Sequence, residues 1–239
     1  LAFLAAIVAG WAAVHVAGVY LWDPAIHGWA VAALLIALQT WLGAGLFILA
    51  HDCMHGSLVP GRPRANRRIG ALLVALYAGF RYDELKRAHL AHHRHPGTAD
   101  DPDFDPREPT SFVRWFARFF RQHYRHRQLL AIGAALSVSV LVFGAVPWRL
   151  AAFWGLPALL SAVQLFAFGT YLPHRREGGV FADEHRARSR AMPHWASLLG
   201  CYHFGAFHHE HHLHPGVPWW RLPQARTRNG VGQTLRDLS

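Results

Sequence analysis

The residue of this sequence best suited to chemistry is histidine, which occurs 19 times in 239 residues. Eight histidines fall in three short clusters, and within each cluster they are mostly three or four residues apart, a spacing that places side chains on one face of a helix. The clusters are His51 and His55; His89, His92 and His93; and His208, His211 and His212. Because neutral imidazole binds Zn, Cu, Fe or Ni, the clusters predict a metal site.

A ninth candidate ligand is His174, which stands alone in the sequence YLPH at 171–174. One tetrahedral ion uses about four ligands, so nine histidines predict two ions with room for water or oxygen. We expect roles in orienting the ligands, or surface positions, for His95, His203, His209 and His214. We expect solvated or interfacial positions for His123, His126, His185 and His194, and no special role for His15 and His27. The two cysteines, Cys53 and Cys201, are expected to be small packing residues.

Other site chemistries fit the sequence poorly. His51 is followed by Asp52, so the H-E-x-x-H motif of zinc proteases is missing its glutamate. The sequence has no G-x-S-x-G, P-loop or G-x-G-x-x-G motif. Its long apolar runs also contain none of the glutamates that bind metal in carboxylate-bridged helical bundles. The predicted site is therefore held by imidazole alone.

Four apolar runs free of Asp, Glu, Lys and Arg must position these histidines. They cover about 1–22, 28–50, 129–147 and 150–173. Because an α-helix needs about 20 such residues to cross a bilayer, we predict an all-α membrane protein with four transmembrane helices. A shorter apolar run at 69–80 fits a re-entrant or interfacial segment. The length suits one domain over 1–239, and the first residue, Leu1, indicates a missing N-terminal piece.

Cations mark one side of the predicted membrane. Of 24 Lys and Arg residues, 14 lie in 51–128 and nine in 174–239, so four crossings place 23 on one face. The positive-inside rule makes that face cytoplasmic, which puts the three histidine clusters in a cytoplasmic cap on the inner membrane. The cations are divided between two segments next to the membrane, and the sequence has no nucleic-acid-binding motif. Both observations argue against a nucleic-acid partner. Residues 110–127 carry aromatics on one helical face and arginines on another, which fits a helix at the headgroup boundary or one packed on the cap.

Longer sequence blocks carry a family resemblance. The blocks are HDCMHG at 51–56, HLAHHRHPGTADDPDF at 89–104, FGTYLPHR at 168–175 and HFGAFHHEHHLHPGVPWWRLP at 203–223. Together with the predicted spans between them, they cover nearly the whole chain. They resemble the membrane fatty acid desaturase/hydroxylase superfamily and, within it, the bacterial carotenoid β-ring 4-ketolases. The resemblance implies a non-haem diiron centre bound by the eight clustered histidines, with His174 matching the lone histidine of the family's YLPH block. Asp52 keeps the family's H-D-x-x-H form and is a candidate catalytic residue beside the diiron centre. Cys53 stands where a small residue such as Ala is expected.

The resemblance implies an O₂-dependent oxygenase in the bilayer. Its substrate would be a carotenoid such as β-carotene, whose C4 methylene would be hydroxylated twice and lose water to give a ketone. Each round would take O₂ and two electrons, from a ferredoxin-type donor at the cytoplasmic face. The arginine-rich face suits an acidic donor and anionic lipid equally well. Candidate ring-pocket residues, which fit interfacial anchoring as well, are Phe204, Phe207, Trp219 and Trp220.

Three alternatives stay open at this stage. A fatty acyl desaturase or a carotenoid 3-hydroxylase would use the same diiron site, and box spacing does not separate them from a ketolase. A non-catalytic metal-binding membrane protein, such as a transporter, is a more distant alternative. Transporters place ionisable ligands near the middle of the membrane, and the predicted spans are nearly free of them.

Overall fold

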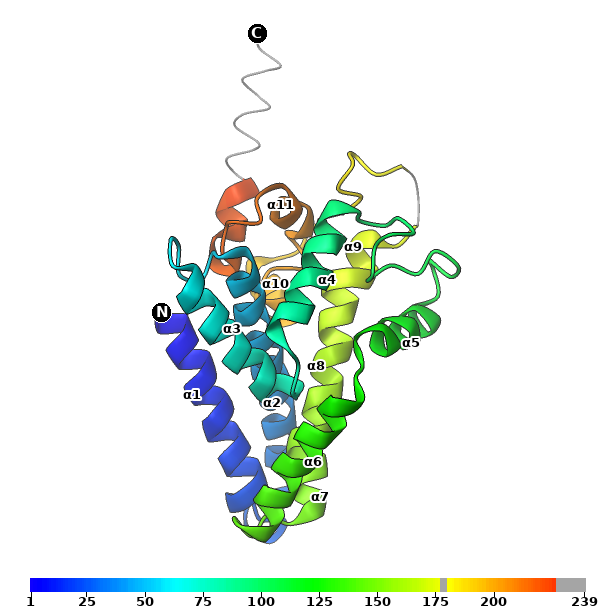
Figure 1. Cartoon of the computed structure of the whole chain (residues 1–239). Helices are drawn as coiled ribbons and strands as arrows, with labels where there is room; N and C mark the ends of the chain where they lie inside the picture. The colour runs from blue at the N-terminus through cyan, green and yellow to red at the C-terminus, as the bar shows by residue number, and fades with distance from the viewer. Residues whose placement is uncertain (177–179, 227–239) are drawn as a thin grey trace.

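The computed structural model describes residues 1–176 and 180–226, and the regular secondary structure of these residues is entirely helical (Figure 1). The predicted all-α class is therefore confirmed. Three of the helices are long and apolar enough to cross a membrane: Ala2–Leu21, Pro24–His55 and Pro147–His174. They correspond to the first, second and fourth predicted spans.

Helix α2 (Pro24–His55) is the central element. The Asp23 side chain caps its start by accepting a hydrogen bond from the Ala25 N–H at 2.8 Å, and Gly56 ends it in the left-handed conformation (φ 77°). The helix packs against α1 (Ala2–Val16), α3 (Pro63–Ala78) and α8 (Leu156–Phe166). Gly28 (φ 71°) interrupts the helix near its start, and the 27 residues from 29 to 55 are about 40 Å long, which exceeds the roughly 30 Å of a bilayer core. The last turn of α2 can therefore lie outside the hydrocarbon.

The third predicted span is shorter than expected. Residues 129–147 were expected to form a full crossing, but α6 (His126–Leu141) has only 16 residues. The helix stops because Gly144 takes a left-handed conformation (φ 68°) and Pro147 begins the next helix. A helix of 16 residues is about 24 Å long, so a fourth crossing stays a prediction.

The fourth predicted span forms one continuous helix, Pro147–His174. It comprises α7 (Pro147–Leu150), α8 and α9 (Leu172–His174), joined by π-helical turns at Ala151–Gly155 and Ala167–Tyr171. A π-turn holds one more residue than an α-turn and is often found at functional sites. The second of these turns comes directly before the short α9, which ends on His174.

Helix α5 (Phe112–His123) is the amphipathic helix expected in 110–127. Its buried Trp115 packs against Phe104, Phe166 and Tyr171. The aromatic face of α5 thus covers α8 and the turn after it, within the fourth predicted span. The 69–80 run is part of α3, whose 16 residues pack against α2.

The histidine clusters lie at one end of the molecule. The α1–α2 and α6–α7 links are at the bottom of Figure 1, while α4 (Tyr82–Arg94), α9 and α11 (His208–Leu213) meet at the top. Helix α10 (His194–Cys201) and a 3₁₀ turn at Trp219–Arg221 complete the upper part. The histidine-rich end therefore lies opposite the links that join α1 to α2 and α6 to α7.

Candidate metal centre

Helix α2 brings its two histidines to the site from below. His51 and His55 are one turn apart, and their ring centroids are separated by 4.8 Å. Asp52, between them, is buried and points elsewhere: its Oδ2 accepts a hydrogen bond from the Trp219 N–H at 3.2 Å. The aspartate of this box therefore ties the end of α2 to the C-terminal segment.

The nine predicted ligands all meet, and they divide into two groups. Within each group the candidate ligand atoms lie within 4.8 Å of one another. The first group, here called the five-histidine group, is His51, His55, His89, His93 and His211; the second, the four-histidine group, is His92, His174, His208 and His212. The four-histidine group is fully buried, and the five-histidine group is partly so.

The boxes of the sequence do not coincide with these groups. In α4, His89 and His93 enter the five-histidine group and His92 enters the other. In α11, the pair four residues apart, His208 and His212, belongs to the four-histidine group. His211 belongs to the five-histidine group. Around the helix axis, residues i and i+4 lie closer together than residues i and i+3. The pair four residues apart therefore stays in one group on each helix. Both helices therefore contribute to both groups.

The facing nitrogens are spaced like ligands of shared ions. Within the four-histidine group, His208 Nε2 lies 3.0 Å from His174 Nε2 and 3.1 Å from His212 Nε2. One imidazole nitrogen either donates or accepts a single hydrogen bond, so His208 Nε2 cannot bond well to both neighbours. Nitrogens bound at about 2.1 Å to one ion are about 3.0–3.4 Å apart, so a shared cation satisfies all three.

The five-histidine group has similar close contacts. His93 Nε2 and His211 Nε2 are 3.0 Å apart, and His55 Nε2 and His89 Nε2 are 2.6 Å apart. The donor set of both groups is imidazole, which suits borderline metals such as iron and zinc rather than Ca²⁺ or Mg²⁺. The residues present therefore fit two transition-metal ions.

Burial keeps these imidazoles neutral. Burial, followed by the charges of neighbouring histidines, lowers the pKa of His89, His208, His211 and His212 well below the usual value and lowers the pKa of His93 to about 2. A histidine must be neutral to bind a metal, since protonation occupies the lone pair that the metal needs. At pH 7 these side chains are thus in the ligand form.

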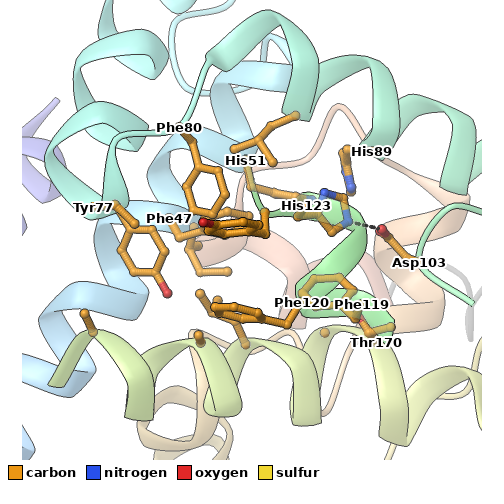
Figure 2. A pocket seen from close by; sticks show the side chains of 18 of the residues that line it. Phe47, His51, Tyr77, Phe80, His89, Asp103, Phe119, Phe120, His123 and Thr170 are labelled. Carbon is orange, nitrogen blue, oxygen red and sulfur yellow. Dashed lines mark hydrogen bonds and ion pairs between the residues drawn. The ribbon is translucent and has the colours of Figure 1, made fainter. Parts of the chain in front are cut away.

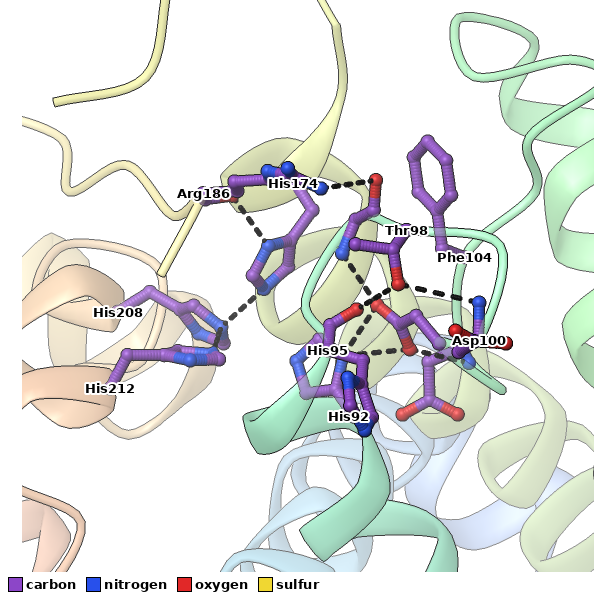
Figure 3. A network of polar contacts seen from close by, with 12 residues as sticks. His92, His95, Thr98, Asp100, Phe104, His174, Arg186, His208 and His212 are labelled. Atoms are coloured by element: carbon purple, nitrogen blue, oxygen red, sulfur yellow. Dashed lines mark hydrogen bonds and ion pairs between the residues drawn. The ribbon is translucent and has the colours of Figure 1, made fainter. Parts of the chain in front are cut away.

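Two rings of the four-histidine group are oriented by hydrogen bonds. The Nδ1–H of His174 donates to the Arg186 carbonyl oxygen at 2.8 Å (Figure 3). The Nδ1–H of His92 donates to the Asp101 carboxylate, with both oxygens at 3.0 Å. In each case the hydrogen sits on Nδ1, which leaves the Nε2 lone pair for the metal.

Asp101 is a residue that sequence reasoning missed. It is 2% exposed and also accepts hydrogen bonds from the Gly97 N–H and the Asp103 N–H, each at 2.8 Å. Burial disfavours a charged His92, but the hydrogen bond and charge of Asp101 outweigh it and raise the pKa of His92. The only sequence signal for this aspartate was its place in the HPGTADDPDF block.

A cavity of about 360 Å³ leads to both groups (Figure 2). His51 and His89 of the five-histidine group and His92 and His208 of the four-histidine group line one part of it. Away from the histidines, its lining is largely apolar and includes Phe47, Tyr77, Phe80, Phe116, Phe119, Phe120, Leu129, Ile132, Leu159 and Leu165. The cavity therefore connects the apolar helices with the candidate metal centre.

Of the four predicted pocket residues, only Phe204 lines this cavity. Phe207 is buried in the core that surrounds α2, where Arg226 lies 4.2 Å above its ring centroid. Trp219 and Trp220 pack against Phe3 at 5.2 Å and 5.3 Å between ring centroids. These three side chains thus join the C-terminal segment to α2 and α1, outside the lining of the cavity.

The remaining histidines have varied surroundings. His203 Nδ1 contacts the Ser197 hydroxyl at 3.1 Å, and His209 Nε2 contacts Asp183 at 2.7 Å. His123, expected to be solvated or interfacial, lines the cavity and pairs with Asp103 at 2.7 Å. Exposed positions include His27, His95, His126 and His214. Both cysteines are buried free thiols, in agreement with a packing role.

Comparisons with known proteins place this arrangement in a family. The sequence profile of the fatty acid desaturase family matches residues 24–135 and 121–234. The chain belongs to this family. Among its relatives, the β-carotene ketolase of Paracoccus sp. strain N81106 is 50% identical over 93% of this chain and 90% of the relative. The β-carotene ketolase of Paracoccus sp. strain PC1 is 47% identical over 96% of this chain and 93% of the relative.

The similarity extends beyond bacteria. A β-carotene ketolase of Haematococcus lacustris is 39% identical over 84% of this chain and 64% of the relative. The resemblance found in the histidine-containing blocks is therefore confirmed over nearly the whole chain. A more distant relative, the sn-1 oleoyl-lipid 12-desaturase of Anabaena variabilis, is 25% identical over 92% of this chain and 75% of the relative.

Proposed function

We propose that this protein is a β-carotene ketolase that oxidises the C4 methylene of a carotenoid β-ring to a ketone. The observation that carries the proposal is the cavity, which joins apolar helices to nine histidines in two groups. The names of the relatives point to the same substrate and reaction. A largely apolar cavity suits a hydrocarbon ring that enters from the bilayer.

We infer two non-haem iron ions as the cofactor, one for each histidine group. Zinc has no redox chemistry, whereas iron held by imidazole can activate O₂, which the oxidation of an unactivated C–H bond requires. The five-histidine and four-histidine groups would hold the ions, and Asp101 would orient one ligand. A carotenoid 4-ketolase with this cofactor would use all nine histidines as iron ligands.

The chain itself would position the ring and exclude water. Aromatic side chains of α3 and α5 line the cavity and would keep one end ring of the substrate beside the histidines. Each of two rounds uses one O₂, two electrons and two protons: one oxygen atom enters a C4–H bond and the other leaves as water. The resulting gem-diol loses water to give the ketone.

For topology, we propose one domain over 1–239 with four crossings, α6 being a short one, and the histidine-rich cap at the cytoplasmic face of the inner membrane. Both links between paired helices lie at the opposite end in Figure 1, which agrees with an even number of crossings. Bilayers adapt to a short helix by local thinning. Reporter fusions in 22–27, 142–146 and 95–111 test this: the first two should report the periplasm and the third the cytoplasm.

Electrons would come from a ferredoxin-type donor. Arginines are numerous in the segments that form the cap, and an acidic donor would be attracted to them. Turnover by purified protein with a reduced ferredoxin, compared at low and high salt, tests this partner. Salt should slow the reaction with ferredoxin more than the reaction with a small neutral reductant.

The experiment that tests the function is expression in a bacterial host that makes β-carotene, followed by pigment chromatography. Echinenone and canthaxanthin are expected. Hydroxylated pigments would favour a carotenoid 3-hydroxylase, and altered lipid unsaturation would favour a fatty acyl desaturase. Metal binding without any O₂-dependent product would favour a non-catalytic metal-binding protein.

A further inference from the structure

One carboxylate stands out in the cavity wall. Asp103 lines the cavity beside aromatic side chains such as Phe119, and 12% of its side chain is exposed. Its Oδ1 accepts a hydrogen bond from His123 Nε2 at 2.7 Å (Figure 2). His123 is the last residue of α5, so the pair joins that helix to the loop after α4.

Asp103 lies beside the candidate metal centre. Its carboxylate, that of Asp101 and a nitrogen of His92 lie within 4.8 Å of one another. The reacting carbon of a substrate must approach the histidine groups, and so must the ring carbons next to it. Any polar group on a neighbouring ring carbon would then come within reach of this carboxylate.

The position of Asp103 is fixed by its backbone. Its carbonyl oxygen accepts a hydrogen bond from Trp115 Nε1 at 2.6 Å, and its N–H donates to Asp101 Oδ1. Trp115 is fully buried. The carboxylate is therefore held in place by partners on two sides rather than swinging freely from the loop.

An unsubstituted hydrocarbon ring would form no favourable polar contact with the Asp103 carboxylate. Covering a carboxylate with an unsubstituted ring removes water from the charged group and supplies no hydrogen bond in return. His123 meets one oxygen, and the other can accept a further hydrogen bond, because an ionised carboxylate has about four acceptor sites. The natural complement is an O–H donor on the ring.

We propose that Asp103, positioned by His123, recognises a hydroxyl group at C3 of the substrate ring and so favours 3-hydroxylated β-rings over unsubstituted ones. C3 is bonded to C4, the carbon that would be oxidised. A C3 hydroxyl that donates a hydrogen bond to Asp103 would therefore hold C4 close to the histidines. The hydroxyl donates and the carboxylate accepts. This inference rests on the proposed ketolase function and adds a substrate preference to it.

The test is internal competition. Membranes containing the enzyme are given β-carotene and zeaxanthin, its 3,3′-dihydroxy form, in equal amounts, and the ratio of their keto products is measured in wild type and variants. A hydrogen bond to a charged group changes such ratios by about tenfold to a hundredfold. The zeaxanthin to β-carotene conversion ratio should therefore fall by at least about tenfold in Asp103→Leu. Asp103→Asn, whose amide oxygen still accepts, should keep part of the preference.

Asp105→Leu is the matched control, since it removes a buried carboxylate from the same loop outside the cavity lining. Its ratio should equal that of wild type, and iron content per chain is measured for every protein. An unchanged ratio in Asp103→Leu with normal iron would overturn the inference. So would equal changes in the Asp103 and Asp105 variants, or loss of iron from Asp103→Asn, which would make Asp103 a ligand. If wild type makes no keto product from either carotenoid, the proposed function fails instead.

Discussion

His92 and Asp101 form a buried pair in which a ring N–H of the histidine faces both carboxylate oxygens at 3.0 Å. The side chains of the two residues are 4% and 1% exposed. Such a carboxylate fixes the tautomer of a metal-binding histidine and strengthens it as a ligand.

The first prediction follows from this pair. Asp101→Asn removes the charge that holds the His92 hydrogen on Nδ1, so metal affinity should fall by about tenfold to a hundredfold. Iron retained after dialysis against graded chelator concentrations measures the change. Asp100→Asn, at the exposed neighbouring position, should retain iron like wild type. Equal retention in both variants would mean that Asp101 does not support a ligand.

A second prediction concerns the ligands themselves. His211→Ala or His92→Ala removes one imidazole from a group that binds an ion, so keto-pigment formation should be abolished and iron content lowered. Elemental analysis and pigment chromatography measure the two effects. His27→Ala, at an exposed position near the start of α2 and far along that helix from His51, should alter neither. Full activity in a cluster variant would remove that histidine from the ligands.

A third prediction tests the cavity. Ala162 lines it, and a phenylalanine at this position would occupy space that the substrate ring needs. Ala162→Phe should lower turnover by about tenfold or more while iron content stays normal, since a small misplacement of substrate is costly. Ala134→Phe, on an exposed face of α6, is the control and should have turnover like wild type. Similar turnover in the two variants would show that substrate does not use this cavity.

A fourth prediction concerns packing under the site. A Cβ at Gly45 in α2 would collide with the hydroxyl of the buried Tyr202 and lie 3.0 Å from Ile7 Cγ2. Gly45→Ala should therefore destabilise the protein by about 1–3 kcal/mol. Thermal unfolding in detergent measures the loss. Gly133→Ala, where no atom lies within 4 Å of the added carbon, should not be destabilised in the same assay.

The sequence carried enough information to predict which histidines meet. Spacing along a helix depends only on local geometry, so clusters such as His51 and His55 could be recognised without a fold. It did not show which ligands of different helices share a group, because that depends on how α2, α4, α9 and α11 pack together. Such packing between distant segments is not revealed by one sequence.

The residues that sequence reasoning missed share a cause. Asp101, Asp103 and His123 have no helical spacing to the ligands, and they reach the site through a loop and the end of α5. The third span was overestimated for a different reason: hydropathy continues through 142–146, but Gly144 and Pro147 interrupt the helix. Composition alone does not register such a break.

Neither histidine group can be assembled by a fragment of the chain. The five-histidine group draws on residues from His51 to His211, and the four-histidine group from His92 to His212. During synthesis, nearly all of the polypeptide must leave the ribosome before either group of histidines is complete. Iron bound by these groups, as proposed above, would therefore be acquired late in biogenesis, and it would report that the segments from His51 to His212 have been assembled.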